Sequence, residues 1–341
     1  MISVDEIKAQ DAREYFMQSL GEPERKSGKW NFYLCPFHNE KTPSFGVAET
    51  GAKCFGCGWH GDVIQYYEDT HRVSFIEAVE MLGGEIAQVT PEMTAKRMEA
   101  RKAQIDAQIE KHQLAIERLR AERKWLEYHE GLNARGRQLW AARGVPEWWQ
   151  DWWQLGYSSA YPLWRKDEND LWQNWWSGES ISIPLKEYGG DVTQIKHRFI
   201  EPPTPERRYH QEYYNAGQHP FICDTATQSG ALVLVEGEIK SQVTFIGLDS
   251  ANIQCIGLPS MTPSDSVYDT MGGYDPIYFI PDPGAFAQKD GISSAGKVTA
   301  RLGVERVRVI QIADKIDDAI NSGLITKSGL YQLMRMGRRY G

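Results

Sequence analysis

A cluster of three cysteines and one histidine near the N-terminus constrains the fold of this chain more than any other feature. Cys35 and His38 form one short pair, Cys54 and Cys57 form a second, and residues 39–53 separate the two pairs. Three thiolates and one imidazole at this spacing can close a tetrahedral Zn²⁺ site between two hairpin-like turns. Because four protein ligands leave no open coordination position, we predict a structural zinc ion.

The zinc ion would also supply much of the stability of the N-terminal segment. A segment of fewer than about ninety residues has a marginal hydrophobic core, whereas a structural zinc ion contributes about 10–16 kcal/mol of apparent binding free energy. The alternative interpretation is a set of buried cysteines beside a chance histidine. His60 is a further candidate ligand, but it follows Cys57 without a second ligand beside it, so we expect it to be exposed.

The overall composition is typical of a globular protein with more than one domain. The chain has 341 residues, of which 41% are hydrophobic and 25% are charged, and we find no apolar run long enough to span a membrane. An odd number of cysteines with metal-type spacing favours the reducing cytoplasm over a disulfide framework. The net charge of −8 excludes a uniformly basic nucleic-acid binder, so any nucleic-acid site must be a local basic patch.

The chain is predicted to consist of consecutive segments of different character. Residues 1–90 hold the zinc cluster, and residues 91–130 form a helical linker. The remaining segments are a strand-rich subdomain over 131–225, an α/β domain over 226–325 and a basic C-terminal helix over 326–341. The predicted fold class is therefore α/β, or α+β over the whole chain, with a small zinc-ribbon-like N-terminal domain.

The composition of the linker favours one long helix over residues 92–130. The segment is rich in Ala, Glu, Lys, Arg and Gln, and no glycine occurs between Gly84 and Gly131. Thr90 is expected to cap this helix, and Pro91 suits its first turn. Its apolar residues follow a loose heptad pattern: Ile105, Ile109, Ile116, Leu119 and Leu126. This pattern fits a solvated linker that docks one stripe on a neighbouring domain or, alternatively, a coiled coil with a second chain.

The part of the chain after the linker alternates strand and helix signals. Residues 181–185 and 194–200 are predicted to pair as strands around a turn at Gly189 and Gly190. Fully apolar runs, which are typical of buried parallel strands, occur in three places: 231–235, 277–280 and 307–311. The segments between these runs are long enough for helical crossovers, so we predict a mainly parallel sheet covered by helices.

Tryptophan is concentrated in one stretch of the sequence. Eight of the 12 tryptophans fall between Trp148 and Trp176. We favour the interpretation that they form the packed core of a subdomain. The alternative is that some of them stack on the bases of a single strand of nucleic acid.

Acidic side chains follow each of the three predicted parallel strands. Glu236 comes directly after the first strand, Asp282 follows the second, and Asp317 and Asp318 lie beyond the third. Because ligands of open α/β sheets gather at the carboxyl ends of the strands, we expect these carboxylates to share one edge. Carboxylate oxygens suit Mg²⁺ or Mn²⁺, and nucleotidyl transfer needs such ions to hold a triphosphate and activate a hydroxyl. The alternative is an ordinary strand-to-helix turn at Glu236 and Gly237.

Residues 291–298 partly match the sequence of a phosphate-binding P-loop. Val298, however, occupies the position of the hydroxyl that ligates Mg²⁺, and no apolar strand leads directly into Gly291. We therefore interpret this segment as a loop that leads into a helix.

The zinc cluster and its flanking residues resemble the zinc-binding domain of bacterial and phage DnaG-type primases. The resemblance covers residues 35–45 and 53–64, so it extends well beyond the four ligands. It implies that this domain contacts a single-stranded DNA template and helps to select the initiation site. The candidate contributors are basic and aromatic residues: Lys41, Lys53, Phe37, Phe45 and Phe55. The three phenylalanines would equally suit a small core around the metal.

The acidic strand ends resemble the Toprim fold of the same primases and of topoisomerases, which would make 131–225 and 226–325 the two parts of a primase core. The resemblance implies metal-dependent nucleotidyl transfer with a catalytic and Mg²⁺- or Mn²⁺-binding set of acids: Glu236, Asp282, Asp317 and Asp318. It also implies basic residues that meet template and nucleotide phosphates: Lys196, Arg198, Arg207, Arg208 and Lys240. Two positions depart from the family pattern, because Gly284 and Lys240 stand where the family usually has acids. Glu238 or Asp290 could replace the missing carboxylates.

These resemblances imply a DnaG-like DNA primase of a bacterial cell, encoded by a phage or another mobile element. Its product would be short RNA primers on single-stranded DNA. The expected partners are the DNA template, ribonucleoside triphosphates and a replicative helicase, without a membrane. The expected cofactors are a structural Zn²⁺ and a catalytic Mg²⁺ or Mn²⁺. The alternatives are a non-catalytic primase-like accessory protein that binds DNA, and a Toprim nuclease.

Overall fold

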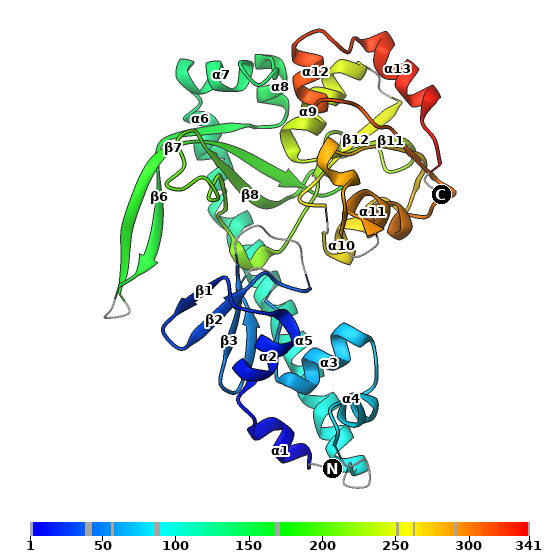
Figure 1. Ribbon diagram of the computed structural model, residues 1–341. Helices are drawn as coiled ribbons and strands as arrows, with labels where there is room; N and C mark the ends of the chain where they lie inside the picture. The colour runs from blue at the N-terminus through cyan, green and yellow to red at the C-terminus, as the bar shows by residue number, and fades with distance from the viewer. Residues whose placement is uncertain are drawn as a thin grey trace. The chain divides into compact units, whose positions relative to one another are not determined.

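The computed structural model shown in Figure 1 describes most of the chain. The described residues are 3–37, 43–55, 58–84, 89–167, 171–249, 252–261, 263–289 and 292–339. The chain divides into two compact units, residues 1–110 and residues 111–341. None of the helices in the described ranges combines the length and the apolar character that crossing a membrane requires.

The first unit is built on a five-stranded antiparallel sheet in the order β1-β2-β3-β4-β5. Its strands are β1 (Arg25–Ser27), β2 (Trp30–Tyr33), β3 (Phe45–Ala48), β4 (Gly51–Cys54) and β5 (His60–Gly61). Its helices are α1 (Val4–Ala9), α2 (Ala12–Leu20), α3 (Val63–His71) and α4 (Phe75–Met81). Capping boxes start α1 at Ser3 and α4 at Ser74, so each of these short helices begins with satisfied amide groups.

An aromatic core joins the sheet of the first unit to its helices. Phe16 of α2 and Phe45 of β3 are fully buried, and their ring centroids lie 5.5 Å apart. Phe37 stacks on Trp59 with centroids 4.6 Å apart. Such rings bury a large apolar area for a domain of this size. Gly51 is required at the start of β4, because a Cβ atom there would lie 2.5 Å from the carbonyl oxygen of Gly61.

The predicted linker forms two helices instead of one. α5 (Pro91–Glu122) ends where Arg123 adopts a left-handed conformation with φ 51°, and α6 (Lys124–Glu130) follows. The predicted cap is confirmed, because the Thr90 hydroxyl accepts a hydrogen bond from the amide of Met93. The single helix over 92–130 is therefore wrong, since the hydrogen-bond ladder is interrupted at Arg123.

The apolar stripe of α5 is buried only near its C-terminal end. Leu119 is fully buried against Trp125, whereas Ile105 and Ile109 are about half exposed. The boundary between the two units falls inside this helix. This arrangement matches a linker helix that docks one stripe.

After α6, the second unit continues with helices α7 (Ala134–Ala141) and α8 (Glu147–Trp152), which lead into a four-stranded antiparallel sheet in the order β6-β7-β8-β9. Its strands are β6 (Gly156–Lys166), β7 (Trp172–Lys186), β8 (Val192–Phe199) and β9 (Tyr209–Gln211). The predicted hairpin is confirmed, because Ile181 pairs with Arg198 and the chain turns at Gly189 and Gly190. The strand β7 is much longer than the predicted 181–185, and β6 was not predicted; both extend beyond β8 (Figure 1).

The second unit ends in a five-stranded sheet in the order β10-β12-β11-β13-β16. Its strands are β10 (Phe221–Ile222), β11 (Gly230–Glu236), β12 (Ile253–Leu258), β13 (Tyr274–Ile280) and β16 (Val307–Val309). All neighbours are parallel except β10, which pairs antiparallel with β12. The apolar runs predicted as parallel strands are therefore confirmed, and so is the mixed α/β fold class.

Helices cover both faces of this sheet, as Figure 1 shows. They are α9 (Glu238–Leu248), α10 (Asp265–Asp269), α11 (Ser294–Leu302), α12 (Ile316–Asn321) and α13 (Lys327–Met336). Short turns of 3₁₀ helix, η2 (Tyr214–Ala216) and η3 (Pro283–Phe286), and the small hairpin β14 (Gln288–Lys289) with β15 (Ile292–Ser293) complete the unit. The P-loop-like segment leads into α11, which Ser293 caps; Gly291 lies outside the described residues.

Two cysteines of this sheet are structural and buried. Cys223 and Cys255 are almost inaccessible to solvent, and the amide of Cys223 donates to the carbonyl of Cys255. Burial raises the pKa of both thiols well above the usual range. They therefore behave as small apolar side chains.

Candidate metal and nucleic-acid sites

The described part of the zinc cluster lies at one end of the N-terminal sheet. Tyr33 of β2 pairs with Phe45 of β3, which in turn pairs with Cys54 of β4. Because β2 and β4 both run antiparallel to β3, they end on the same side, and this brings Cys35 and Cys54 to one edge. Both side chains are buried. His38 and Cys57 lie outside the described residues.

The surroundings of the two described cysteines fit zinc-bound thiolates. The amide of Phe37 donates to the sulfur of Cys35 at 3.4 Å, and the Ser44 hydroxyl lies 3.2 Å from the sulfur of Cys54. N–H and O–H groups around a thiolate orient it and stabilise its negative charge. The chemistry of this donor set therefore suits Zn²⁺. His60 is exposed, as expected.

One face of the N-terminal sheet carries aromatic rings covered by cations. Trp30, Phe32 and Phe55 surround Gly46, where a Cβ atom would lie 3.0–3.2 Å from all three rings. The Arg25 guanidinium lies 4.1 Å from the centroid of the Phe32 ring. The ammonium groups of Lys29 and Lys53 lie 5.4 Å and 5.5 Å from the centroids of Trp30 and Phe55, respectively. Proteins that bind single-stranded nucleic acid commonly combine aromatic rings, on which bases stack, with cations that attract the phosphates.

The sequence prediction identified only part of this aromatic face. Phe55 and Lys53 belong to it, whereas Phe45 is fully buried and Phe37 packs in the core. Lys41 lies outside the described residues. The missed residues are Arg25, Lys29, Trp30 and Phe32. Their alternation of basic and aromatic residues just before the first zinc ligand was the available signal.

The two principal predicted acids follow neighbouring parallel strands. Val235 of β11 lies opposite Ile280 of β13, so Glu236 and Asp282 emerge at the same edge of the sheet within two residues of this pair. Both are partly exposed. The two carboxylates therefore share one edge of the sheet, as the strand pattern led us to expect.

One of these two acids, Asp282, forms an ion pair with a lysine. The ammonium group of Lys240, in the first turn of α9, donates to both carboxylate oxygens of Asp282 at 2.7 and 2.6 Å. Lys240 was expected to meet phosphates, but in this structure its charge is directed to Asp282. Among the described residues, no three His, Cys, Asp or Glu side chains lie close enough together to hold a metal ion.

Asp317 and Asp318 lie in the first turn of α12, also near Lys240. Oxygen Oδ1 of Asp317 is buried and has no hydrogen-bond partner among the described residues. Burial, followed by the neighbouring charge of Asp318, raises the pKa of Asp317, while Lys240 opposes this effect. A buried carboxylate oxygen without a donor is costly and is a natural site for a cation.

A second ion pair connects the antiparallel sheet to α9. The ammonium of Lys196 in β8 donates to Glu238 at 2.6 Å, and both side chains are almost fully buried. Glu238 is therefore engaged by Lys196. The Lys196 charge also lies 4.7 Å from the centroid of the Tyr209 ring.

Tyr209 and two arginines form the exposed rim beside this pair. Arg198 donates to the Tyr209 hydroxyl at 3.1 Å, and 41% of Tyr209 is exposed. Arg143 interacts electrostatically with Arg198, Asp317 and Asp318, and burial lowers the pKa of its guanidinium. The rim therefore places the accessible ring of Tyr209 beside the positive charges of Arg198 and Arg143. Arg143 and Tyr209 were not predicted as site residues.

The other predicted basic residues lie elsewhere. The Arg207 guanidinium lies 5.3 Å from the centroid of the Trp175 ring. Arg208 donates to the carbonyl of Pro205. Asp290, the other candidate replacement for a missing carboxylate, lies outside the described residues.

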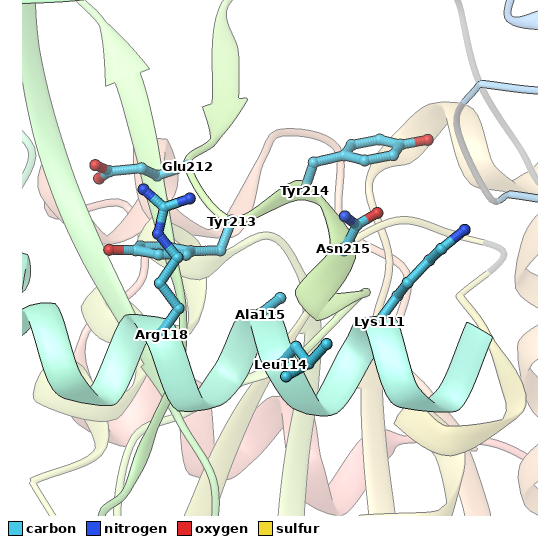
Figure 2. A pocket seen from close by; sticks show the side chains of 8 residues that line it. All are labelled: Lys111, Leu114, Ala115, Arg118, Glu212, Tyr213, Tyr214 and Asn215. Atoms are coloured by element: carbon cyan, nitrogen blue, oxygen red, sulfur yellow. The ribbon is translucent and has the colours of Figure 1, made fainter. Parts of the chain in front are cut away.

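A surface pocket of about 380 Å³ lies between α5 and the segment after β9 (Figure 2). Figure 2 shows Arg118 and Lys111 rising from α5 toward residues 212–215. Glu122 holds the Arg118 guanidinium at 2.7 Å. Hydrogen bonds from Tyr213 and Arg118 lower the pKa of Glu122 to about 2. Glu122 therefore stays ionised behind two of the residues that line the pocket, Tyr213 and Arg118. The pocket was not predicted from the sequence.

The tryptophan-rich stretch is only partly core. Trp153 is buried, and its indole N–H donates to the carbonyl of Cys223 at 2.9 Å. More than half of the surface is exposed in four others: Trp148, Trp152, Trp164 and Trp172. The packed-core interpretation is wrong for these four.

Comparison with known families and proteins identifies the N-terminal region. Residues 19–99 match the family model of the CHC2 zinc finger, the zinc ribbon of DnaG-type primases. This region of the chain is therefore similar to the CHC2 zinc finger, as the resemblance found in the sequence led us to expect.

Named relatives match the same part of the chain. It is 42% identical over 96 residues to a DNA primase of Staphylococcus aureus (strain COL), which corresponds to 27% of this chain and 16% of the relative. It is 46% identical over 76 residues to a DNA primase of Lactococcus lactis, or 22% of this chain and 12% of the relative. The matches thus span less than a fifth of the length of these relatives.

Similar solved structures include the zinc-binding and RNA polymerase domains of the Aquifex aeolicus primase. That structure is 19% identical, covers 99% of this chain and 86% of its own, and gives a TM-score of 0.47. A DnaG primase catalytic domain bound to single-stranded DNA is 14% identical, covers 69% of this chain and 83% of its own, and also gives 0.47.

Proposed function

We propose that this chain is a DNA primase that synthesises short RNA primers on a single-stranded DNA template. The observation that carries the proposal is the CHC2 zinc finger over residues 19–99, which matches named DNA primases. Further support comes from the acidic edge at Glu236 and Asp282, which follows two neighbouring strands of an α/β sheet. The same proposal includes ribonucleoside triphosphates as substrates and a replicative helicase as a partner. It also includes a bacterial host, a phage origin of the chain and the segment boundaries predicted from the sequence.

The carboxylates of the edge fit one divalent ion better than two. Mg²⁺ in nucleotide enzymes is commonly held by one or two carboxylates and by substrate phosphates, so a cage of three protein ligands is not required. Glu236 and Asp317 would hold the ion, with Asp318 close by, and the unpartnered oxygen of Asp317 favours this assignment. Asp282 has both oxygens bonded to Lys240 and does not fit a second ion unless that pair opens. When bound, Mg²⁺ or Mn²⁺ would neutralise the triphosphate and its leaving pyrophosphate.

Other residues of the chain would bind the template and the nucleotide phosphates. The aromatic face of the zinc finger would hold template bases, while Lys53, Arg25 and Lys29 meet phosphates. In the second unit, Arg198 and Arg143 would orient the nucleotide phosphates beside the acidic edge. Lys196 would act indirectly, because its charge is committed to Glu238.

A primer-synthesis assay tests this function. Labelled ribonucleotides, a single-stranded template and Mg²⁺ or Mn²⁺ should yield short oligomers with the unaltered chain. Glu236→Gln and Asp317→Asn should reduce the product by about 10²-fold or more, because each removes a group that stabilises charge in the transition state. Asp265→Asn, which changes an exposed acid of the same unit, should leave the product unchanged.

The ion pair of Lys240 with Asp282 favours a second candidate, a non-catalytic accessory protein that binds single-stranded DNA. The absence of oligomers with either ion, together with intact DNA binding, would establish this alternative and reject the primase. Strand cleavage in the same assay would instead identify a Toprim nuclease.

A further inference from the structure

The longest hairpin of the second unit extends past the sheet to which it belongs. β8 pairs with β7 only from Ser180 to Lys186, whereas β6 pairs with β7 as far as Lys166 and Trp172. The distal part, which we call the hairpin arm, comprises the described residues of 161–178. Figure 1 shows the arm projecting away from the rest of its unit.

The root of the arm is packed and its outer part is not. Trp176 packs edge-on against Phe199 with centroids 4.7 Å apart, and Leu163 is buried beside them. Further out, Trp164 is 56% exposed and Trp172 is 65% exposed. Indole rings on a projecting hairpin are therefore displayed to solvent, although they gain little stability for the fold there.

Cations accompany the rings on both faces of the arm. Trp164 and Lys166 are two residues apart on β6, so they share a face, and Lys166 lies opposite Trp172 in the register. The Lys166 ammonium lies 5.7 Å from the centroid of the Trp172 ring. Arg165 points to the other face, where its guanidinium lies 5.5 Å from the centroid of Trp175.

The arginine charges on the second face are not neutralised by carboxylates. The guanidinium of Arg207 lies 5.3 Å from the same Trp175 ring, so that two arginines flank one indole. Within the described ranges, neither Arg165 nor Arg207 forms an ion pair. The nearby Asp167 carboxylate accepts hydrogen bonds from the Leu171 amide and the Gln173 side chain.

We propose that the hairpin arm binds a single strand of nucleic acid, whose bases stack on Trp164 and Trp172. Lys166 lies on the same face as these rings, and the charges of Arg165 and Arg207 on the other face attract the phosphate backbone of the strand. A protein partner would require a contiguous apolar patch depleted of lysine, whereas this arm places rings beside cations, and two of the nearby cations, Arg165 and Arg207, form no ion pair within the described ranges. A single strand fits better than a duplex, because the bases of a duplex are already stacked on one another.

This binding site adds to the proposed function but does not depend on catalysis. It predicts binding without nucleoside triphosphates or divalent ions, so a chain that fails to prime can still satisfy it. Conversely, a chain that primes without using the arm would reject this inference alone.

The test uses the full chain and a single-stranded oligonucleotide that carries 4-thiothymidine. Ultraviolet crosslinking followed by peptide mapping should place adducts on Trp164 and Trp172. In equilibrium titrations, Trp164→Ala/Trp172→Ala should weaken binding by about 5-fold or more, and Trp164→Tyr/Trp172→Tyr should restore most of it, because tyrosine also stacks.

A matched control comes from the same stretch of sequence. Trp148 and Trp152 on α8 are 65% and 57% exposed, but the described residues place no lysine or arginine over their rings. Trp148→Ala/Trp152→Ala should leave binding unchanged. Arg165→Gln/Arg207→Gln should instead reduce the salt dependence of binding, since phosphate contacts release counterions.

Three results would overturn the inference. The first is unchanged affinity and crosslinking in the Trp164/Trp172 double variant. The second is equal competition by duplex and single strand. The third is sedimentation that shows self-association through the arm, which would identify a second copy of the chain as its partner. Because the altered rings are exposed, matching thermal melting curves will verify that each variant is folded.

Discussion

The ammonium group of Lys240 lies 2.7 and 2.6 Å from the two carboxylate oxygens of Asp282. Both side chains are mostly buried, so water screens their attraction only weakly. The pair fixes a positive charge at the acidic edge of the parallel sheet and fills the donor atoms of one carboxylate. This edge therefore offers fewer oxygens to divalent ions than its acidic sequence suggests.

Replacing Lys240 with aspartate should raise the affinity of the edge for Mn²⁺. The change removes the competing ammonium and adds a carboxylate in the first turn of α9, four residues after Glu236 at the end of β11. Hydrogen bonds to charged groups contribute about 1.5–3 kcal/mol, so the affinity should rise on the order of tenfold. Mn²⁺ titration followed by electron paramagnetic resonance measures the effect. Lys297→Asp, an exposed position with the same change of charge, is the control, and equal affinities in both variants would contradict the competition.

Asp317→Asn should stabilise the fold at neutral pH in the absence of divalent ions. The pKa of Asp317 is raised by burial, so the folded chain holds this proton more tightly than the unfolded chain. The stabilisation that the protonated group provides is complete below the unfolded pKa and is lost as pH rises through the folded pKa. Urea unfolding at several pH values should show the gain of the variant growing over that interval. Asp314→Asn, at an exposed acid in the same segment, should show no such growth.

Breaking the ion pair between Lys196 and Glu238 from one side should be strongly destabilising. Lys196→Met leaves the Glu238 carboxylate buried without its partner, which typically costs about 3–5 kcal/mol. The double variant Lys196→Met/Glu238→Leu should recover much of this loss, because it removes both charges. Denaturant unfolding of the three chains measures the coupling. Additive losses would show that the two side chains do not act as a pair.

Removing zinc should expose thiols only in the N-terminal unit. The buried Cys223 and Cys255 should not react with a thiol reagent while the second unit is folded, because their pKa values are raised and their sulfurs are inaccessible. Chelation should therefore release reactive thiols from the zinc cluster alone. Thiol titration and zinc quantification on one sample should give matching curves. Reaction of Cys223 in the folded chain would contradict this account.

The sequence was sufficient to predict features that depend on spacing and periodicity. The zinc cluster was recognisable because the ligand pairs are local, and the parallel strands were recognisable because their apolar runs are continuous. The shared edge of Glu236 and Asp282 followed from a general property of parallel sheets.

Features that depend on tertiary partners could not be predicted in the same way. Nothing local indicates that Lys240 bonds to Asp282, because the two residues meet only when α9 packs on the sheet. The exposed Trp164 and Trp172 were assigned to a core, since an apolar side chain on a projecting hairpin has the same local sequence signal as one in a sheet. The break at Arg123 also lacks a glycine or proline that would have marked it.

The boundary between the two units falls within α5, so each unit holds one part of the same helix. Arg97 pairs with Asp62 in the first part, and Leu119 is buried in the second. A residue inserted within either part would turn the helix residues that follow it by about 100° about the helix axis. Length changes inside these two docked parts are therefore expected to destabilise the unit concerned.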